Sequence, residues 1–285
     1  MAGTYKAAFP ACGPAVWAAD GRRAYRGGTS GPSFDADAQA YFDEVSLSDP
    51  AYTVPINQFV LDLKAASLWT KFDRLWVLAN ADATAALTCI KSLEVATPVN
   101  TPTFTAGQGY AGDGTTSYLD TNFVPSTDGV NYAQDSAAVI DYIRTANNQS
   151  GGYDIATTGG GHNSWLISRF TADFTAYASN NTGAGDLASV VVANGVGLYI
   201  STRVAASGAG AQVLYKAGSS IATGTQASTG LPTASFFIGG RNNGGTPAQI
   251  SNGQHSLVGF SSALNASDVT AFGTAFGTLQ TAIGF

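Results

Sequence analysis

Carboxylates come first in a search for catalytic residues, because hydrolysis of a glycosidic bond normally needs two of them, about 5 Å or about 6.5–9.5 Å apart. Glu44 and Glu94 are the only glutamates in the 285 residues, and both precede the part of the chain that is rich in predicted strands. Aspartates could replace them, for instance Asp141 with Asp154 or Asp173, but the sequence shows no organised pair. We therefore expect that the protein is not an enzyme.

Histidine and cysteine are also sparse. His162 follows three glycines, His255 opens a predicted strand, and no Gly-x-Ser-x-Gly nucleophile motif occurs. Each histidine is predicted to be a polar loop or strand-end residue rather than a general base or a ligand. Cys12 and Cys89 follow no metal-ligand spacing and form either two buried thiols, the favoured alternative, or one disulfide bridge. We expect no metal and no cofactor.

Two aspartates bracket a Gly-rich turn. Asp113 and Asp120 could share a Ca²⁺ ion with carbonyl oxygens, but calcium sites need several oxygen ligands and the sequence offers two here. Capping of the turn by an aspartate is the favoured alternative, because aspartate side chains commonly accept hydrogen bonds from the backbone N–H groups of turns.

Two other Gly-rich loops carry the residues best suited to binding a sugar. Tryptophan offers a ring face, while amide and guanidinium groups can meet hydroxyls. Two alternatives stay open, namely that the tryptophan is buried at the start of a strand and that the second loop is an ordinary turn. The candidate binding residues are His162, Asn163 and Trp165 from the first loop and Arg241, Asn242 and Asn243 from the second.

The composition favours a β-rich framework for these loops. There are 34 glycines and only 11% charged residues, a mixture that suits short strands joined by tight turns. A formal net charge of −6 argues against nucleic-acid binding, which needs clustered lysine and arginine. No apolar run approaches the ~20 residues of a membrane span, and the N-terminus lacks the apolar core of a signal peptide. We expect a soluble protein that does not use the usual secretory route.

Residues 1–32 form the first of three predicted segments. They have no sustained hydrophobic period, so we expect an extended attachment arm that docks onto a partner. Arg22, Arg23 and Arg26 are the candidate docking residues; a solvated turn is the alternative for them.

The other two segments are predicted to be helical and β-rich. Residues 33–95 contain two amphipathic helices that make a hairpin, the second starting near Thr53. Residues 96–285 hold about ten short strands, the number and spacing of a sandwich or jelly roll. The run from Val196 to Val204 alternates in side-chain character as a strand does, and Asn265 can cap a C-terminal helix.

Four motifs follow one another along the chain: LWxKFDxLWVL at 68–78, VNTPTF at 99–104, GDGTTSYLDT at 112–121 and FIGGRNNGG at 237–245. In this order they resemble a group of bacteriophage and prophage virion proteins that carry a concanavalin A-like, or laminin-G-like, jelly-roll domain in tail, fibre or spike components. The resemblance covers roughly Phe34 to the C-terminus. It implies a mainly β protein, a jelly-roll β-sandwich preceded by the arm and a small helical hairpin.

The resemblance also implies a function. The leading hypothesis is a non-enzymatic structural component of a phage or phage-like particle, a tail, fibre, spike or decoration protein on the exposed virion surface. Its jelly roll would serve adhesion and could bind a host-surface glycan. Its expected partners are other virion proteins, through the arm, and further copies of itself. The alternative is a secreted or surface-bound bacterial lectin or glycan hydrolase with a concanavalin-like fold.

Overall fold

The computed structural model describes residues 33–183 and 188–285. The predicted arm, with Arg22, Arg23, Arg26 and Cys12, lies outside the described residues. Residues Phe34–Phe285 form one compact unit, in which the predicted helices and the predicted strands contribute to a common hydrophobic core.

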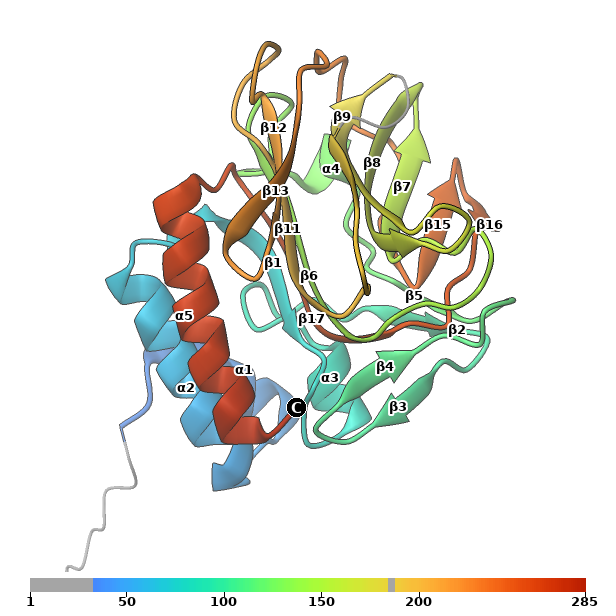
Figure 1. The fold of residues 1–285 in the computed structure, drawn as a ribbon. Helices are drawn as coiled ribbons and strands as arrows, with labels where there is room; N and C mark the ends of the chain where they lie inside the picture. Colours follow the sequence, from blue (N-terminus) through green and yellow to red (C-terminus); the bar gives the residue numbers. More distant parts are fainter. Residues whose placement is uncertain (1–32, 184–187) are drawn as a thin grey trace, which may run out of the picture. The chain divides into compact units, whose positions relative to one another are not determined.

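The unit is a mainly β, jelly-roll-like sandwich of two sheets, which confirms the predicted fold class (Figure 1). The eight-stranded sheet contains, in spatial order, β13 (Ser219–Gly224), β12 (Gln212–Lys216), β11 (Gly197–Arg203), β6 (Ala137–Thr145), β17 (Gln254–Ser261), β4 (Gly109–Ala111) and β3 (Thr103–Thr105), with β1 (Phe72–Val77) also paired to β17. The nine-stranded sheet contains β10 (Ala188–Val191), β9 (Thr175–Thr182), β8 (His162–Phe170), β7 (Ile155–Gly159), β14 (Phe237–Ile238), β5 (Tyr118–Asp120) and β2 (Thr97–Val99), with β15 (Gly240–Asn243) paired to β7 and to β16 (Thr246–Ala248). Strand pairs in the described residues are antiparallel, except that β15 runs parallel to β7.

Three helices, α1 (Ala36–Val45), α2 (Pro50–Ala65) and α5 (Ala266–Ile283), cover the outer face of the eight-stranded sheet, as Figure 1 shows. The described helices are α1 (Ala36–Val45), α2 (Pro50–Ala65), the 3₁₀ turn η1 (Trp69–Lys71), α3 (Ala83–Leu87), α4 (Pro125–Asp128) and α5 (Ala266–Ile283). The helices α1 and α2 are those of the predicted hairpin. Helix α2 begins at Pro50 rather than near Thr53, because the Asp49 side chain caps it and proline is tolerated in a first turn. None of the helices in the described ranges is long and apolar enough to cross a membrane.

Strand alternation produces two cores, one on each face of the eight-stranded sheet. In β11, Leu198 and Ile200 pack beneath the helices, whereas Tyr199 points the other way and packs between the sheets. The alternation predicted for this strand is confirmed, although both of its faces are buried. Because neither face of this sheet is free, the outer face of the nine-stranded sheet is the surface that the sandwich leaves open.

Helix α5 is fixed at its start by the predicted capping box. The Asn265 side chain accepts a hydrogen bond from the Asp268 backbone N–H at 3.0 Å, and the Asp268 carboxylate accepts from the Asn265 backbone N–H at 2.9 Å. We expect Asn265→Ala to lower the free energy of unfolding by about 1 kcal/mol, measured by urea denaturation. Asn265→Ser keeps an acceptor and is the control. An alanine variant as stable as the wild type would contradict a stabilising cap.

Candidate functional site

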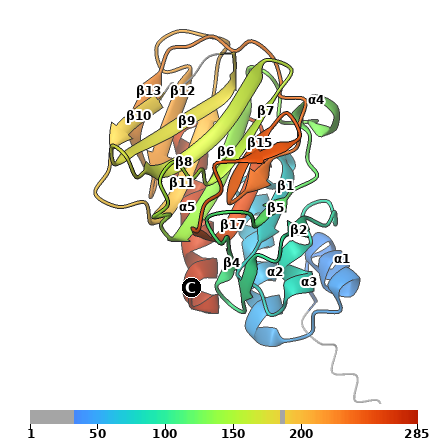
Figure 2. The ribbon, with the colours of Figure 1, turned by 90° about the vertical axis from the view of Figure 1, so that its right-hand side faces the viewer.

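The residues predicted for two sugar-binding loops lie instead in strands β8 and β15 of the nine-stranded sheet, which pair with β7 from opposite sides (Figure 2). Trp165 of β8 pairs with Ala156 of β7, and Arg241 of β15 pairs with the same alanine from the other side. Directly paired residues point to one face of a sheet. The small alanine lets its two large neighbours meet above it, and the Arg241 guanidinium carbon lies 5.7 Å from the centroid of the Trp165 ring.

A polar row runs beside this pair. Thr158 of β7 lies between Asn163 of β8 and Asn243 of β15, so the three side chains share the same outer face. The Nε of Arg241 donates to Thr158 Oγ1 at 3.0 Å, and its Nη2 donates to Asn243 Oδ1 at 3.2 Å. These two hydrogen bonds fix the orientation of a guanidinium group that is only half-buried.

A line of aromatic rings continues from the Arg241 position. Tyr153 packs edge-to-face against Trp165 with centroids 5.8 Å apart, and against Phe170 at 6.5 Å. Phe170 in turn packs against Tyr177 of β9 at 6.2 Å. Tyr153, Phe170 and Tyr177 are each half-buried, so each residue keeps part of its surface in solvent. We call these four aromatic residues together with Arg241 the aromatic face.

Sequence reasoning missed three members of the aromatic face, namely Tyr153, Phe170 and Tyr177. A usable signal was present for two of them, because Phe170 and Tyr177 lie in neighbouring predicted strands that a short loop connects. Nothing local marked Tyr153, which precedes β7 and reaches the face only through the fold.

Trp165 does not offer an exposed ring. It lies inside β8, which begins at His162, and is 6% exposed beneath Arg241 and Tyr153. The alternative that this tryptophan is a buried strand residue is therefore confirmed. Its role on the aromatic face is to support the groups above it.

Two other candidates point away from the aromatic face. Asn242 is 4% exposed, and its Nδ2 donates to Ser235 Oγ at 3.1 Å while its Oδ1 accepts from the Gly245 backbone N–H. Asn242 therefore holds the turn at Gly244 and Gly245, and the prediction that it contacts a sugar is corrected to a structural role. His162 places Nδ1 2.9 Å from Thr229 Oγ1, outside the polar row.

Ionisable groups form a cluster that is buried between the sheets. His255 Nδ1 lies 2.9 Å from Asp141 Oδ2, and Asp154 Oδ2 accepts from the Ser168 backbone N–H at 2.6 Å. Burial raises the pKa of Asp141 to about 6 against the opposing effect of His255, and burial likewise raises the pKa of Asp154. Burial alone would lower the pKa of His255, but the two carboxylates hold that pKa above its usual value.

The cluster corrects the expectation that Asp141 and Asp154 are not organised together. No local pattern indicates the cluster, because Asp141 comes from β6 and His255 from β17, 114 residues later. All three side chains are at most 1% exposed, so no substrate can reach them in this conformation.

The cluster predicts that stability falls as pH rises. Folding raises the pKa of Asp141 to about 6, so the folded state holds this proton more tightly than the unfolded state does. The stability linked to this proton is complete below the unfolded pKa of the group and is lost as pH rises through its folded pKa. His255 acts in the same direction because its pKa is also raised. We expect a higher melting temperature at pH 5.5 than at pH 8, measured by calorimetry. Asp141→Asn should reduce this difference; equal pH dependence in wild type and variant would contradict the assignment.

The turn at Asp113 is capped as favoured from the sequence. The Asp113 carboxylate accepts hydrogen bonds from the backbone N–H groups of Thr115, Thr116 and Ser117, which hold the pKa of that carboxyl far below its usual value. Asp120 instead accepts from the Asn122 backbone N–H. Within residues 33–183 and 188–285, no group of three or more His, Cys, Asp or Glu side chains is placed to hold a metal ion.

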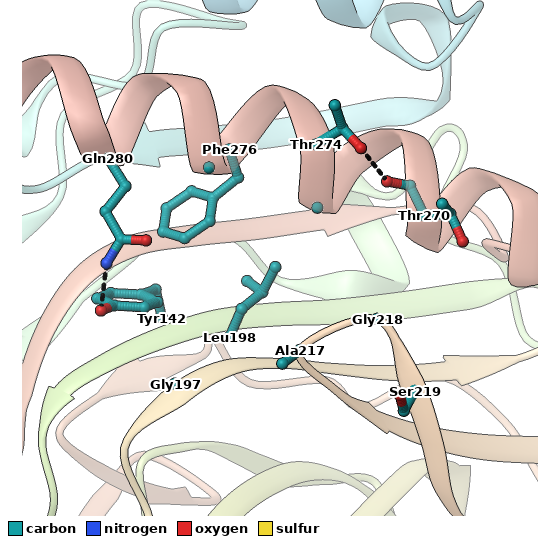
Figure 3. A pocket seen from close by; sticks show the side chains of 12 residues that line it. Tyr142, Gly197, Leu198, Ala217, Gly218, Ser219, Thr270, Thr274, Phe276 and Gln280 are labelled. Atoms are coloured by element: carbon teal, nitrogen blue, oxygen red, sulfur yellow. Dashed lines mark hydrogen bonds between the residues drawn. The ribbon is translucent and has the colours of Figure 1, made fainter.

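A cavity of about 590 Å³ lies between α5 and the edge of the eight-stranded sheet (Figure 3). Small residues of α5 form one wall and the β12–β13 turn forms the other. Its polar groups largely satisfy one another, since Gln280 Nε2 donates to the Tyr142 hydroxyl and Thr274 Oγ1 donates to the Thr270 carbonyl. None of the predicted binding residues lines this cavity.

Neither a protein-family model nor a curated protein matches the chain. Among solved structures, a mutant of Trypanosoma rangeli sialidase displaying trans-sialidase activity is 14% identical, with a TM-score of 0.53 over 85% of this chain and 39% of that chain. Trypanosoma rangeli sialidase in complex with sialic acid is 12% identical, with a TM-score of 0.50 over 72% of this chain and 33% of that chain. The chain thus spans well under half of these proteins, and the likeness shows a shared fold.

The expectation that the protein is not an enzyme is corrected, because the fold that it shares with sialidases at 12–14% identity does not exclude catalysis. Solved structures with this likeness are sialidases, which are enzymes. The prediction relied on the scarcity of glutamate, but sialidases use a tyrosine nucleophile and are exceptions to the two-carboxylate rule. A low glutamate count therefore does not by itself exclude glycoside hydrolysis.

Proposed function

We propose that this chain is a glycan-binding β-sandwich domain whose binding surface is the aromatic face. This is the alternative function that the sequence left open beside a virion role. The observation that carries the proposal is the Arg241 guanidinium at one end of a line of half-buried aromatic residues. Two hydrogen bonds to neutral acceptor groups hold this guanidinium in place.

The chemistry of the face matches what a sugar needs. The C–H faces of a sugar ring pack against aromatic rings, here Tyr153, Phe170 and Tyr177, and its hydroxyls exchange hydrogen bonds with amides and hydroxyls. The polar row supplies those groups from Asn163, Thr158 and Asn243. The shared fold with a sialidase that was solved in complex with sialic acid supports the same class of ligand.

The aromatic face is favoured over the α5 cavity for a physical reason. The face combines half-exposed rings with a cation and a row of amides on a rigid sheet. Six of the twelve residues that line the cavity are glycine or threonine, no charged residue lines it, and Gln280 and Tyr142 already bond each other.

A glycan array followed by titration calorimetry tests the proposal. We expect the wild type to bind at least one glycan class, and Tyr153→Ala combined with Phe170→Ala to weaken that binding at least about tenfold, or about 1.4 kcal/mol. Tyr52→Ala removes a half-buried tyrosine of α2 and is the matched control. Absence of binding to the array, or equal binding by the double variant and the control, would contradict the proposal.

A place on a phage-like particle is a separate proposal, which rests on the sequence resemblance alone. In that setting residues 1–32 would attach the domain to other virion proteins, and the domain would present its aromatic face to a host-surface glycan. Deleting residues 1–32 should then leave the sandwich folded and abolish incorporation into purified particles. Normal incorporation of the truncated chain would place the attachment surface elsewhere.

A further inference from the structure

We propose that the aromatic face selects an acidic glycan, one whose sugar carries a carboxylate, and that Arg241 receives this carboxylate. The inference rests on the proposed glycan-binding function and adds the charge of the ligand to it.

The Arg241 side chain has no counter-ion among the described residues. The ion pairs there involve Lys64, Lys71, Arg74 and His255. The hydrogen-bond partners of Arg241 are a threonine hydroxyl and an asparagine amide, both neutral. A half-buried guanidinium without a carboxylate partner therefore lies at the end of the aromatic line.

Arg241 also keeps free donors. A guanidinium has five N–H groups in one plane. Nε uses its hydrogen on Thr158, Nη2 uses one on Asn243, and no described residue accepts from Nη1. The remaining N–H groups include the Nη1 and Nη2 hydrogens, which can hold a carboxylate through two parallel hydrogen bonds.

The geometry prepares this group for binding. Its guanidinium lies 5.9 Å from the Tyr153 centroid and 5.7 Å from the Trp165 centroid, and two hydrogen bonds fix its direction. An arginine that is already ordered loses little conformational entropy when a ligand arrives. This favours a specific ion contact over a loosely held surface charge.

A second unsatisfied donor lies on the same face. Trp165 Nε1 is buried and has no hydrogen-bond acceptor among the described residues. This N–H lies beneath Arg241 and Tyr153, so the donors that a ligand can reach are those of Arg241. Those donors call for a ligand rich in acceptor oxygens, and an ionised carboxylate is an acceptor only.

The net charge of the protein does not favour an acidic ligand, so a local contact has to select it. The formal net charge of −6 does not attract anions from a distance. The exposed Asp173 carboxylate, beside Tyr177 at the far end of the aromatic line, is already bonded by the Tyr177 hydroxyl and the Thr175 backbone N–H. We therefore assign selection of an acidic sugar to the Arg241 end of the face, where the guanidinium lies beside the Tyr153 and Trp165 rings.

Titration calorimetry with matched glycans tests the inference. The probes are 3′-sialyllactose and a trigalacturonate as acidic glycans, and lactose as the neutral counterpart of the first. We expect at least one acidic probe to bind at least tenfold more tightly than lactose. Arg241→Gln, which removes the charge but keeps an amide, should abolish that preference, and Arg241→Lys should retain part of it. Arg144→Gln is the matched control, because Arg144 is also half-buried and bonds a neutral group, Gln254 Oε1.

The outcomes separate this inference from the function beneath it. If neither acidic probe binds more tightly than lactose, or if a preference survives in folded Arg241→Gln, the acidic selectivity is overturned and glycan binding is left intact. Failure of the wild type to bind these probes and every glycan of the array overturns both. Thermal melts of each variant establish that a lost preference is not lost folding.

Discussion

Replacing Trp165 by alanine is expected to lower the free energy of unfolding by about 3–5 kcal/mol, the range for truncation of a large buried ring. The side chain is 6% exposed and supports both the Tyr153 ring and the Arg241 guanidinium. The measurement is urea denaturation followed by tryptophan fluorescence and circular dichroism. Trp165→Phe keeps most of the volume and should lose less.

Phe174→Ala is the control for this substitution, because Phe174 is 49% exposed. Its replacement should lower the free energy of unfolding by much less than the replacement of Trp165. A Trp165→Ala variant with wild-type stability that has lost glycan binding would contradict the assignment of Trp165 as a supporting residue. It would restore the hypothesis that the tryptophan itself is the sugar platform.

Replacing Asp73 by alanine is expected to lower the free energy of unfolding by about 3 kcal/mol, because one buried and several part-buried donors would lose one shared acceptor. The Asp73 carboxylate of β1 accepts from the backbone N–H groups of Val130, Asn131 and Tyr132 at 2.8–3.0 Å. It also accepts from Asn131 Nδ2 at 2.9 Å. These bonds join β1 to the loop after α4.

The same denaturation experiment checks this prediction. Asp73→Asn keeps one acceptor oxygen and should lose less stability than the alanine variant. If both variants unfold at the wild-type denaturant concentration, the loop is held by its apolar contacts, and the carboxylate contributes little.

Features that depend on neighbours in sequence were predictable. The capping box of α5 needs only Asn265 and Asp268, and the turn at Asp113 needs only the next four residues. The alternation of β11 was readable for the same reason, because a strand places successive side chains on opposite faces. Local chemistry fixes these features, and the fold preserves it.

Features that depend on strand pairing were not predictable. Arg241 meets Trp165 because β15 and β8 pair with β7 from opposite sides, and each pairing places its residue opposite Ala156. No periodicity encodes which strand will lie beside which, so the sequence could nominate both loops but could not bring them together. The same limit hid the bond between His255 and Asp141, and it left Asn242 as a candidate although β15 directs it inward.

The central claim is that a glycan binds the aromatic face, and mapping by NMR tests it most directly. Amide spectra of ¹⁵N-labelled protein would be recorded during titration with 3′-sialyllactose, with lactose as the neutral comparison. We predict that the largest shift changes fall on β8, β9 and β15, around Tyr177 and Arg241, including the Arg241 side-chain Nε–H. Changes confined to α5 and the β12–β13 turn, which line the cavity in Figure 3, would contradict the account.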